Sequence, residues 1–330
     1  MKKRYLLGFC AASMLLMTSC EKDNLFGNAW GEKEGSVNLT VALPEMGVTR
    51  AYGEGKNATR LQYAVFRENG NELVLLGNLT NTAEMVDGKA SIEIKLEANV
   101  DYQFAFWADA NGSSPYSVDV NNHVVTVNGG IGANSENNDA FYGNCKVSLQ
   151  AGTNPMEVTL VRPFAQLNIG TSDFESTKNS GFEIANTKVK VQQAYTKLDL
   201  LTGMATEPVD YEFSLGAIPT GNFPVAGESA DGKPVNYTYL SMNYLLMTAD
   251  KETTTVTFTC ADAAGSNTRT RSYSNVPLQR NWRTNIYGDL MTNGFSINVT
   301  ISPNFADQNG VDDDKTIPED NKEWHDQKQN

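Results

Sequence analysis

Alternation of apolar and polar residues is the dominant pattern along this chain. From Ser36 to Leu43 every second residue is Val or Leu, and the residues between them are Ser, Asn, Thr and Ala. Because successive side chains of a strand point to opposite faces, this segment predicts a strand with one apolar face. Its apolar residues are Val37, Leu39, Val41 and Leu43.

The same alternation returns in short segments separated by turns rich in Gly, Asn and Asp. No segment has the length of a stable isolated helix. Many short strands without alternating helices favour an all-β fold of antiparallel sandwiches over a βαβ architecture. The predicted strands cover residues 37–43, 61–67, 72–76, 91–96, 101–108, 118–127, 141–149, 156–161, 164–169, 187–192, 211–215, 235–247, 253–260, 268–276, 282–290 and 295–301.

A polar stretch from Thr171 to Gly181 interrupts the strands and predicts a boundary between two domains. A mature chain of roughly 300 residues also exceeds one ordinary core. We therefore expect one sandwich over residues 36–172 and a second over residues 182–304. Residues 305–330 are acidic and almost free of aliphatic side chains, which predicts a flexible tail.

The first twenty residues have the features of an export signal. A basic start precedes an apolar run from Tyr5 to Met17, which is too short to span a bilayer as a helix. The segment that ends this run, Leu16-Met17-Thr18-Ser19-Cys20, resembles the lipobox of bacterial lipoproteins. The resemblance implies removal of residues 1–19, attachment of acyl chains such as palmitate to Cys20, and a lipidated linker over residues 20–35. The alternative is an ordinary signal peptide with a chance cysteine.

Charge and motifs exclude several classes of function. Removal of the three basic residues of the signal changes the net charge from −13 to −16, and so acidic a surface repels nucleic acid. The sequence lacks Gly-x-Ser-x-Gly, His-Glu-x-x-His and phosphate-loop motifs, so we expect no enzyme, no catalytic residue and no cofactor. We expect no metal site either, because His123 and His325 both lie away from any cysteine in the sequence.

Three segments together resemble a known family. They are residues 161–169 (VRPFAQLNI), 239–246 (YLSMNYLL) and 276–288 (VPLQRNWRTNIYG). Their order and spacing, with the lipobox, resemble those of the fimbrillin lipoproteins of Bacteroidales (Mfa-like, type V pilins) across nearly the whole mature chain. The resemblance implies two tandem transthyretin-like β-sandwiches, in which the three segments are structural and Phe164, Leu167 and Ile169 pack a core.

The resemblance also implies a mechanism of assembly. In fimbrillins an arginine-specific protease removes the lipidated segment with the first strand, which opens a groove for a donor strand from another subunit. Arg50 and Ala51 follow the alternating strand and form the expected processing site, with Arg60 as a second possibility. Loss of the four apolar residues of that strand would expose roughly 6 to 12 kcal/mol of apolar groove. The same alternation occurs in Phe295, Ile297, Val299 and Ile301, which are either a donor strand or the last core strand of the second domain.

We therefore expect a lipid-anchored surface protein of the outer membrane that is a fimbrial subunit or a fimbria-associated adhesin. Its expected partners are other fimbrial subunits and a ligand on a host or bacterial surface. The rival interpretation is a monomeric outer-membrane lipoprotein that binds glycans or host protein through loops bearing Trp107, Tyr116 or Trp324. Exposed aromatic side chains would favour the rival.

Overall fold

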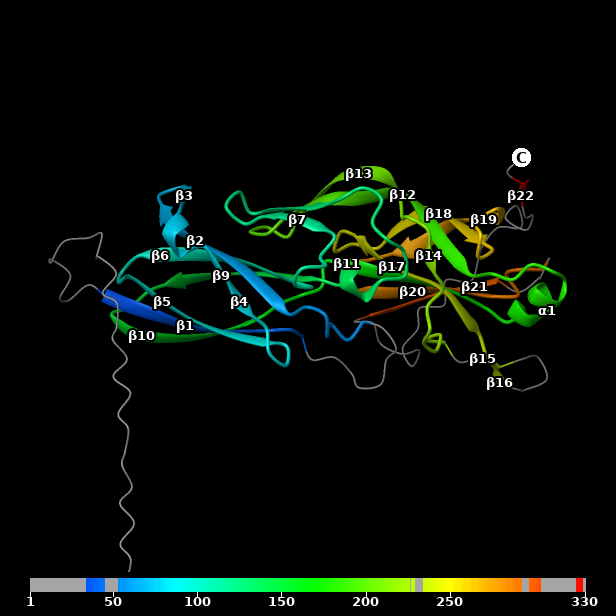
Figure 1. Ribbon diagram of the computed structural model, residues 1–330. Helices are drawn as coiled ribbons and strands as arrows, with labels where there is room; N and C mark the ends of the chain where they lie inside the picture. Colours follow the sequence, from blue (N-terminus) through cyan, green and yellow to red (C-terminus); the bar gives the residue numbers. More distant parts are fainter. Residues whose placement is uncertain are drawn as a thin grey trace, which may run out of the picture.

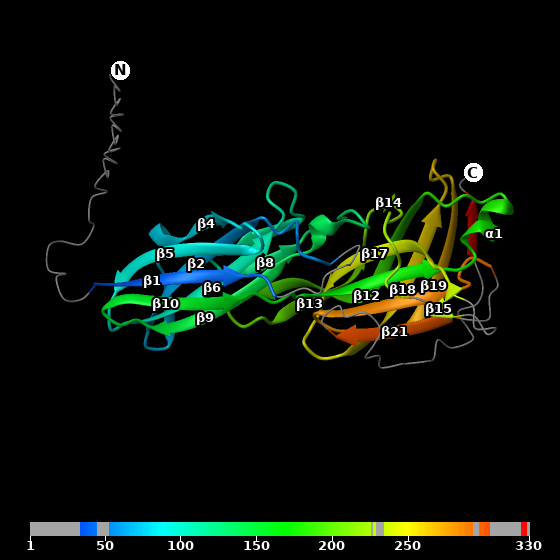
Figure 2. The same ribbon diagram turned by 90° about the horizontal axis from the view of Figure 1, so that it is seen from below.

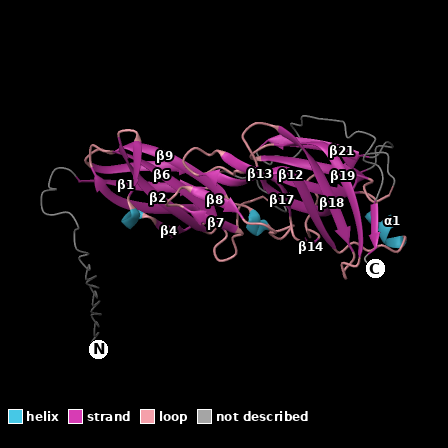
Figure 3. Ribbon diagram, turned by 90° about the horizontal axis from the view of Figure 1, so that it is seen from above, coloured by secondary structure: helices cyan, strands magenta, loops and turns pink. Residues whose placement is uncertain are grey.

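The protein is an all-β molecule, as expected, in which two sandwiches lie end to end in an elongated body (Figures 1 and 3). The computed structural model describes residues 34–44, 53–225, 227–228, 234–292, 297–303 and 325–328. Within these residues, helix is limited to α1 (Phe174–Asn179) and to single 3-10 turns at Gly77–Leu79 and Glu136–Asn138. No helix of this part of the chain is long and apolar enough to cross a membrane.

The first sandwich has a three-stranded sheet packed on a larger one. Its strands are β1 (Glu34–Ala42), β2 (Arg60–Asn69), β3 (Glu72–Leu75), β4 (Asn81–Glu84), β5 (Lys89–Glu97), β6 (Asp101–Asp109), β9 (Phe141–Ser148) and β10 (Gly152–Thr159). The small sheet has the order β10-β1-β5, and the large sheet has the order β3-β2-β6-β9 with β4 also paired to β2. Alternate residues of β1 and β5 point inward and meet the aromatic side chains of β6 in one core.

The second sandwich is larger. Its strands are β7 (Tyr116–Asp119), β8 (Val124–Val127), β11 (Phe164–Thr171), β12 (Asn186–Asp199), β13 (Ala205–Glu212), β14 (Gly216–Ala217), β17 (Thr238–Leu246), β18 (Glu252–Ala261), β19 (Asn267–Leu278), β20 (Trp282–Gly288), β21 (Ile297–Pro303) and β22 (His325–Lys328). One sheet has the order β17-β11-β20-β21, and the other has the order β22-β19-β18-β12-β8-β7 with β13 and β14 on β12. A separate short ribbon pairs β15 (Gly227–Glu228) with β16 (Pro234–Val235).

The two sandwiches are joined by a third apolar cluster rather than by a loose linker. The ring of Trp107 from β6 packs edge-on against Tyr116 and Phe164, which belong to strands of the second unit. The long strand β12 reaches the same place, where its end pairs with β8 and where Leu198 is buried. Shared burial of this kind favours a rigid connection over free movement of the two units.

The expected domain boundary is wrong. β11 does not end the first sandwich, because it pairs with β17 and β20. The polar stretch at 171–181 contains α1 and follows the first strand of the second sandwich. The chain enters the second unit first with the hairpin of β7 and β8 and returns to the first unit with β9. Its last crossing lies between the end of β10 at Thr159 and the start of β11 at Phe164. The polar composition of the stretch at 171–181 comes from a surface helix and not from a linker. The last crossing between the units, at residues 160–163, is short and largely buried.

Two further expectations need correction. The strand expected at 118–127 is a hairpin of β7 and β8, turned by His123 at a positive φ of 50°, and it pairs with β12 instead of joining the first sandwich. Four residues of the expected flexible tail form β22, which adds to the edge of β19. The rest of the tail, the signal with Cys20 and most of the expected linker lie outside the described residues, and β1 begins at Glu34, inside the expected linker.

Candidate functional site

The first strand, β1, lies between two partners and completes the small sheet of the first sandwich. It pairs antiparallel with β5 and parallel with β10, as Figure 2 shows. Leu39, at its centre, lies opposite Ile92 on one side and Met156 on the other. Removal of β1 would therefore leave two strands with unpaired backbone groups facing each other across a gap of one strand.

The inward side chains of β1 form part of the core, as the alternation predicted. Val37, Leu39 and Val41 are at most 1% exposed, and Leu43 beyond the strand is partly buried against the same cluster. Burial of the three contributes on the order of 5 to 9 kcal/mol in total. The strand is thus a large part of what holds the first sandwich closed.

The expected processing site, Arg50 and Ala51, lies outside the described residues, which resume at Gly53. Arg60, the second possibility, begins β2, and its guanidinium donates two hydrogen bonds of 2.9 Å to Asp109, whose side chain is fully buried. A protease needs an extended and accessible substrate, so the pairing of Arg60 with Asp109 disfavours cleavage at Arg60.

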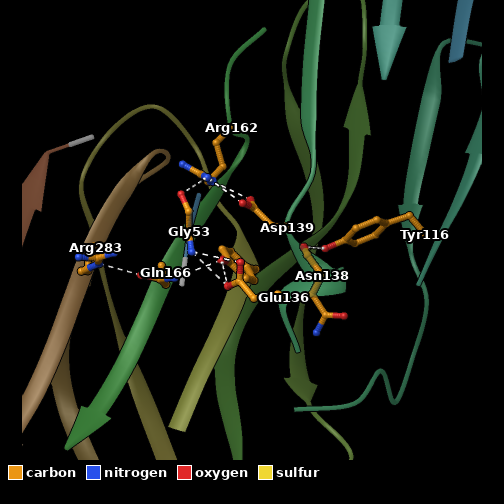
Figure 4. Close-up of polar contacts among 9 residues, drawn as sticks. Gly53, Tyr116, Glu136, Asn138, Asp139, Arg162, Gln166 and Arg283 are labelled. Carbon is orange, nitrogen blue, oxygen red and sulfur yellow. Dashed lines mark hydrogen bonds and ion pairs between the residues drawn. The ribbon is translucent and has the colours of Figure 1, made fainter. Parts of the chain in front are cut away.

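Gly53, the first described residue after that segment, is held by hydrogen bonds from its backbone to two side chains. The backbone N–H of Gly53 donates to both carboxylate oxygens of Glu136, at 3.1 and 3.2 Å. Its carbonyl oxygen accepts a hydrogen bond of 2.9 Å from Nη2 of Arg162. Figure 4 shows Gly53 between these two side chains, and we name the group of Gly53, Glu136, Asp139 and Arg162 the Gly53 clamp.

Local structure explains why these side chains converge. Glu136 begins a single 3-10 turn, whose preceding residue, Ser135, accepts a hydrogen bond from the N–H of Asn137, and Asp139 directly follows the turn. Arg162 lies in the short crossing between the two sandwiches. Its Nε and Nη2 donate to the two oxygens of Asp139 at 2.6 and 2.7 Å, and its guanidinium lies over the ring of Phe141.

The electrostatics of the clamp are those of a buried charge cluster. Burial raises the pKa of Glu136 to about 7, assisted by the nearby charge of Asp139, while Tyr244, Gly53 and Arg162 oppose the rise. The hydroxyl of Tyr244 donates to Glu136 at 2.6 Å. Burial alone would lower the pKa of Arg162, but the charge of Asp139, its hydrogen bonds and the nearby Tyr244 and Glu136 together outweigh burial, and the pKa is raised. This arrangement holds the backbone segment at Gly53 in place.

The three family-like segments meet in one sheet, because β17, β11 and β20 are neighbours there. Buried polar side chains link them: Arg283 donates to Gln166 at 2.7 Å and Asn168 donates to Asn285 at 2.9 Å. Leu167 and Ile169 lie in the core of the second sandwich, and Phe164 lies in the cluster between the units. These segments therefore build the fold next to the clamp.

The possible donor strand is a core strand of the second sandwich in this structure. Among the described strands, β21 pairs with β20 alone, and Val299 and Ile301 are buried while Ile297 is partly buried. Phe295 lies outside the described residues. Of the two expectations for this segment, the core strand describes its place in the single chain.

Two of the three aromatic residues named for the rival interpretation, Trp107 and Tyr116, are buried and are not exposed in loops. Trp107 is fully buried, and its Nε1 donates to Asp109 at 3.0 Å. Tyr116 is buried, and its hydroxyl donates to the carbonyl oxygen of Asn138 (Figure 4). Trp324 lies outside the described residues. Among those residues, no group of three His, Cys, Asp or Glu side chains could hold a metal ion.

Sequence reasoning missed the Gly53 clamp entirely. Arg162 stood in one of the family-like segments, and an arginine between two apolar strands is a signal of a buried charge that needs a partner. The partners could not be found in the same way, because Asp139 lies 23 residues before it and Gly53 lies 109 residues before it. Only the fold brings them together.

Comparison with known proteins gives a family but no activity. The model of a family of unknown function, DUF6562, matches residues 29–323. No curated protein matches the chain.

Solved structures with a similar arrangement come from species of Bacteroides and Parabacteroides. A candidate adhesin from Bacteroides thetaiotaomicron is 11% identical, with a TM-score of 0.47 over 83% of this chain and 98% of its own. A candidate cell adhesion protein from Bacteroides uniformis is 12% identical, with a TM-score of 0.46 over 84% and 100%. A fimbrial assembly protein from Parabacteroides distasonis is 12% identical, with a TM-score of 0.40 over 86% and 99%.

Proposed function

The chain belongs to the family of unknown function DUF6562, and we propose that it is a cell-surface structural or adhesive subunit of the fimbrial type. It is exported as a lipoprotein through Cys20, and its first strand is removed after Arg50 and replaced by a strand of another subunit. Its partners are other fimbrial subunits and the outer membrane, through the lipid. The molecule itself has no enzymatic role.

One observation carries the proposal. The strand β1 is an inner strand of its sheet, yet the segment that joins it to the rest of the chain contains Arg50, and the chain is held independently from Gly53 onward. A cut between these two points would free β1 without loosening Gly53. The clamp thus separates the removable part of the sandwich from the permanent part.

Energetics supports exchange rather than simple loss. An emptied groove exposes apolar side chains of β5 and β10 together with unpaired backbone groups, which favours any strand that can refill it. The incoming strand has an ordering cost of about 1 to 2 kcal/mol per residue, similar to that of the strand it replaces. The exchange is therefore nearly neutral in free energy, and proteolysis makes it irreversible.

Treatment of the purified mature chain with an arginine-specific protease tests the proposal. We expect a new amino terminus at Ala51, followed by ladders on a gel that collapse when the sample is boiled. The Arg50→Ala chain is expected to remain uncut and monomeric. The Arg60→Ala chain is the matched control and should be cut like the wild type.

Cleavage at Ala51 without any assembly, in the presence of the other subunits of the same cell surface, would contradict the proposal. A chain that stays uncut and monomeric but binds glycans would support the rival interpretation. Burial of Trp107 and Tyr116 removes two of the three aromatic residues on which that rival depended.

A further inference from the structure

Gly35, near the start of β1, occupies a position where no other residue fits. It faces the core, on the same side of the strand as Val37, and is buried. A Cβ atom at this position would lie 2.5 Å from the carbonyl oxygen of Gln150 and 2.9 Å from Cδ2 of Leu149. Real Cβ atoms do not come so close to a backbone oxygen, so lack of space explains the glycine here.

The obstructing carbonyl is itself held in place. The side-chain amide of Asn154 donates to the carbonyl oxygens of Gln150 at 2.9 Å and Gly152 at 3.0 Å. Its Oδ1 accepts from the N–H of Gln150 at 3.2 Å. Asn154 therefore ties the turn between β9 and β10 into a fixed shape, and the Gln150 oxygen cannot easily move away from an added methyl group.

The side-chain amide of Asn154 also contacts β1 itself. Nδ2 of Asn154 lies 3.3 Å from the carbonyl oxygen of Ser36, the residue after Gly35. The rest of the groove takes aliphatic side chains at the three following inward positions, which Val37, Leu39 and Val41 fill. Along β1, glycine therefore occupies the first inward position of the groove, and an aliphatic residue occupies each of the next three.

We propose that the groove accepts a strand from a second subunit only when that strand has glycine in the place of Gly35, two residues before three alternating aliphatic residues. This proposal rests on the proposed function, because it names the kind of partner strand that follows removal of β1. Asn154 is the positioning residue that enforces the glycine.

The requirement has a consequence for the possible donor in this chain. If Ile297, Val299 and Ile301 took the three aliphatic places, Phe295 would stand in the place of Gly35. A shift of two residues in either direction puts Asn293 or Ile297 there. The segment at 295–301 therefore does not fit the groove of another copy, and the chain receives a strand of different sequence.

Strand exchange with synthetic peptides tests this inference on the full chain. A site for a specific protease is placed between residues 45 and 50, and the cut chain is refolded from urea with a large excess of labelled peptide. The peptides are residues 34–43, the same peptide with Gly35→Ala or Gly35→Val, and residues 294–303. The control is the Asn38→Ala peptide, since Asn38 is exposed.

We expect the wild-type and Asn38→Ala peptides to bind equally. Overpacking should weaken the Gly35→Ala peptide at least about tenfold, and the Gly35→Val and 294–303 peptides further. The Asn154→Ala chain should recover part of the binding of the Gly35→Ala peptide. Equal binding of the Gly35→Ala and wild-type peptides would overturn the glycine requirement and leave strand exchange standing. Failure of every peptide, the wild type included, would overturn the inference together with the proposed function.

Discussion

Arg162 and Asp139 form an ion pair in which neither side chain is more than 2% exposed. Loss of one partner leaves the other charge buried without compensation, which typically costs about 3 to 5 kcal/mol. We expect Arg162→Ala to lower the free energy of unfolding by this amount, measured by urea titration. The control is Lys197→Ala, which breaks the exposed pair with Glu207 and should cost less than about 1 kcal/mol. Equal effects of the two substitutions would contradict the structural role of the buried pair.

Glu136 makes the stability of the clamp depend on pH. Its pKa is raised in the folded protein from the ordinary 4.5 to about 7, so protonation favours the folded state. The stabilisation is complete below pH 4.5 and is lost as the pH rises through 7, by at most about 3 kcal/mol. We expect Glu136→Gln to remove this loss, so that the variant gains melting temperature relative to the wild type at pH 8 but not at pH 5. If the melting temperatures of the two proteins differed by the same amount at pH 5 and pH 8, Glu136 would not be the group that makes stability depend on pH.

Single residues were predictable where a period fixed their environment. Val37, Leu39 and Val41 were placed in a core by alternation alone, and they are buried. Glu136 and Arg162 escaped prediction because their environment depends on Gly53, which is remote in sequence from both. The residues next to a charged side chain in the sequence do not show whether it is paired in the interior or exposed to solvent.

At the scale of elements, β1 is the strand on which the proposed function depends. Leu39 is at its centre, and truncation of a buried leucine to alanine typically costs about 2 to 5 kcal/mol. We expect Leu39→Ala to reduce the free energy of unfolding by this amount and to speed exchange of β1 in the cut chain. Asn38→Ala, on the exposed face, should change stability by less than about 0.5 kcal/mol. A silent Leu39→Ala would mean that β1 is not part of the core in solution.

Strand positions were predicted better than strand partners. β1, β2, β5 and β6 lie close to where alternation placed them. β11 was also found, but it was assigned to the wrong sandwich, since β17 and β20 are distant in sequence and alternation carries no information on pairing. The hairpin of β7 and β8 was predicted as one strand because its turn has neither glycine nor proline, although Asp119, Asn121 and Asn122 are turn-forming residues.

At the scale of the whole molecule, the apolar cluster around Trp107 and Phe164 joins the two sandwiches into one body. Because both units lose buried surface if this cluster opens, we expect them to unfold in one cooperative transition. Differential scanning calorimetry checks this expectation. Two separate transitions for the wild-type protein would contradict it. If the cluster couples the two units, Phe164→Ala should split the single transition into two.

The two-sandwich architecture followed from the sequence, but the way in which the units are joined did not. Composition suggested a polar linker, whereas the chain crosses through a segment that includes the buried Arg162.

The mass of the protein taken from the cell surface decides whether β1 is removed on assembly, because a single value reports the lipid, the cut and the tail. We expect an assembled form that begins at Ala51 and has lost β1 and the lipid. An assembled form that retains Cys20, its acyl chains and residues 34–42 would contradict the detachable strand.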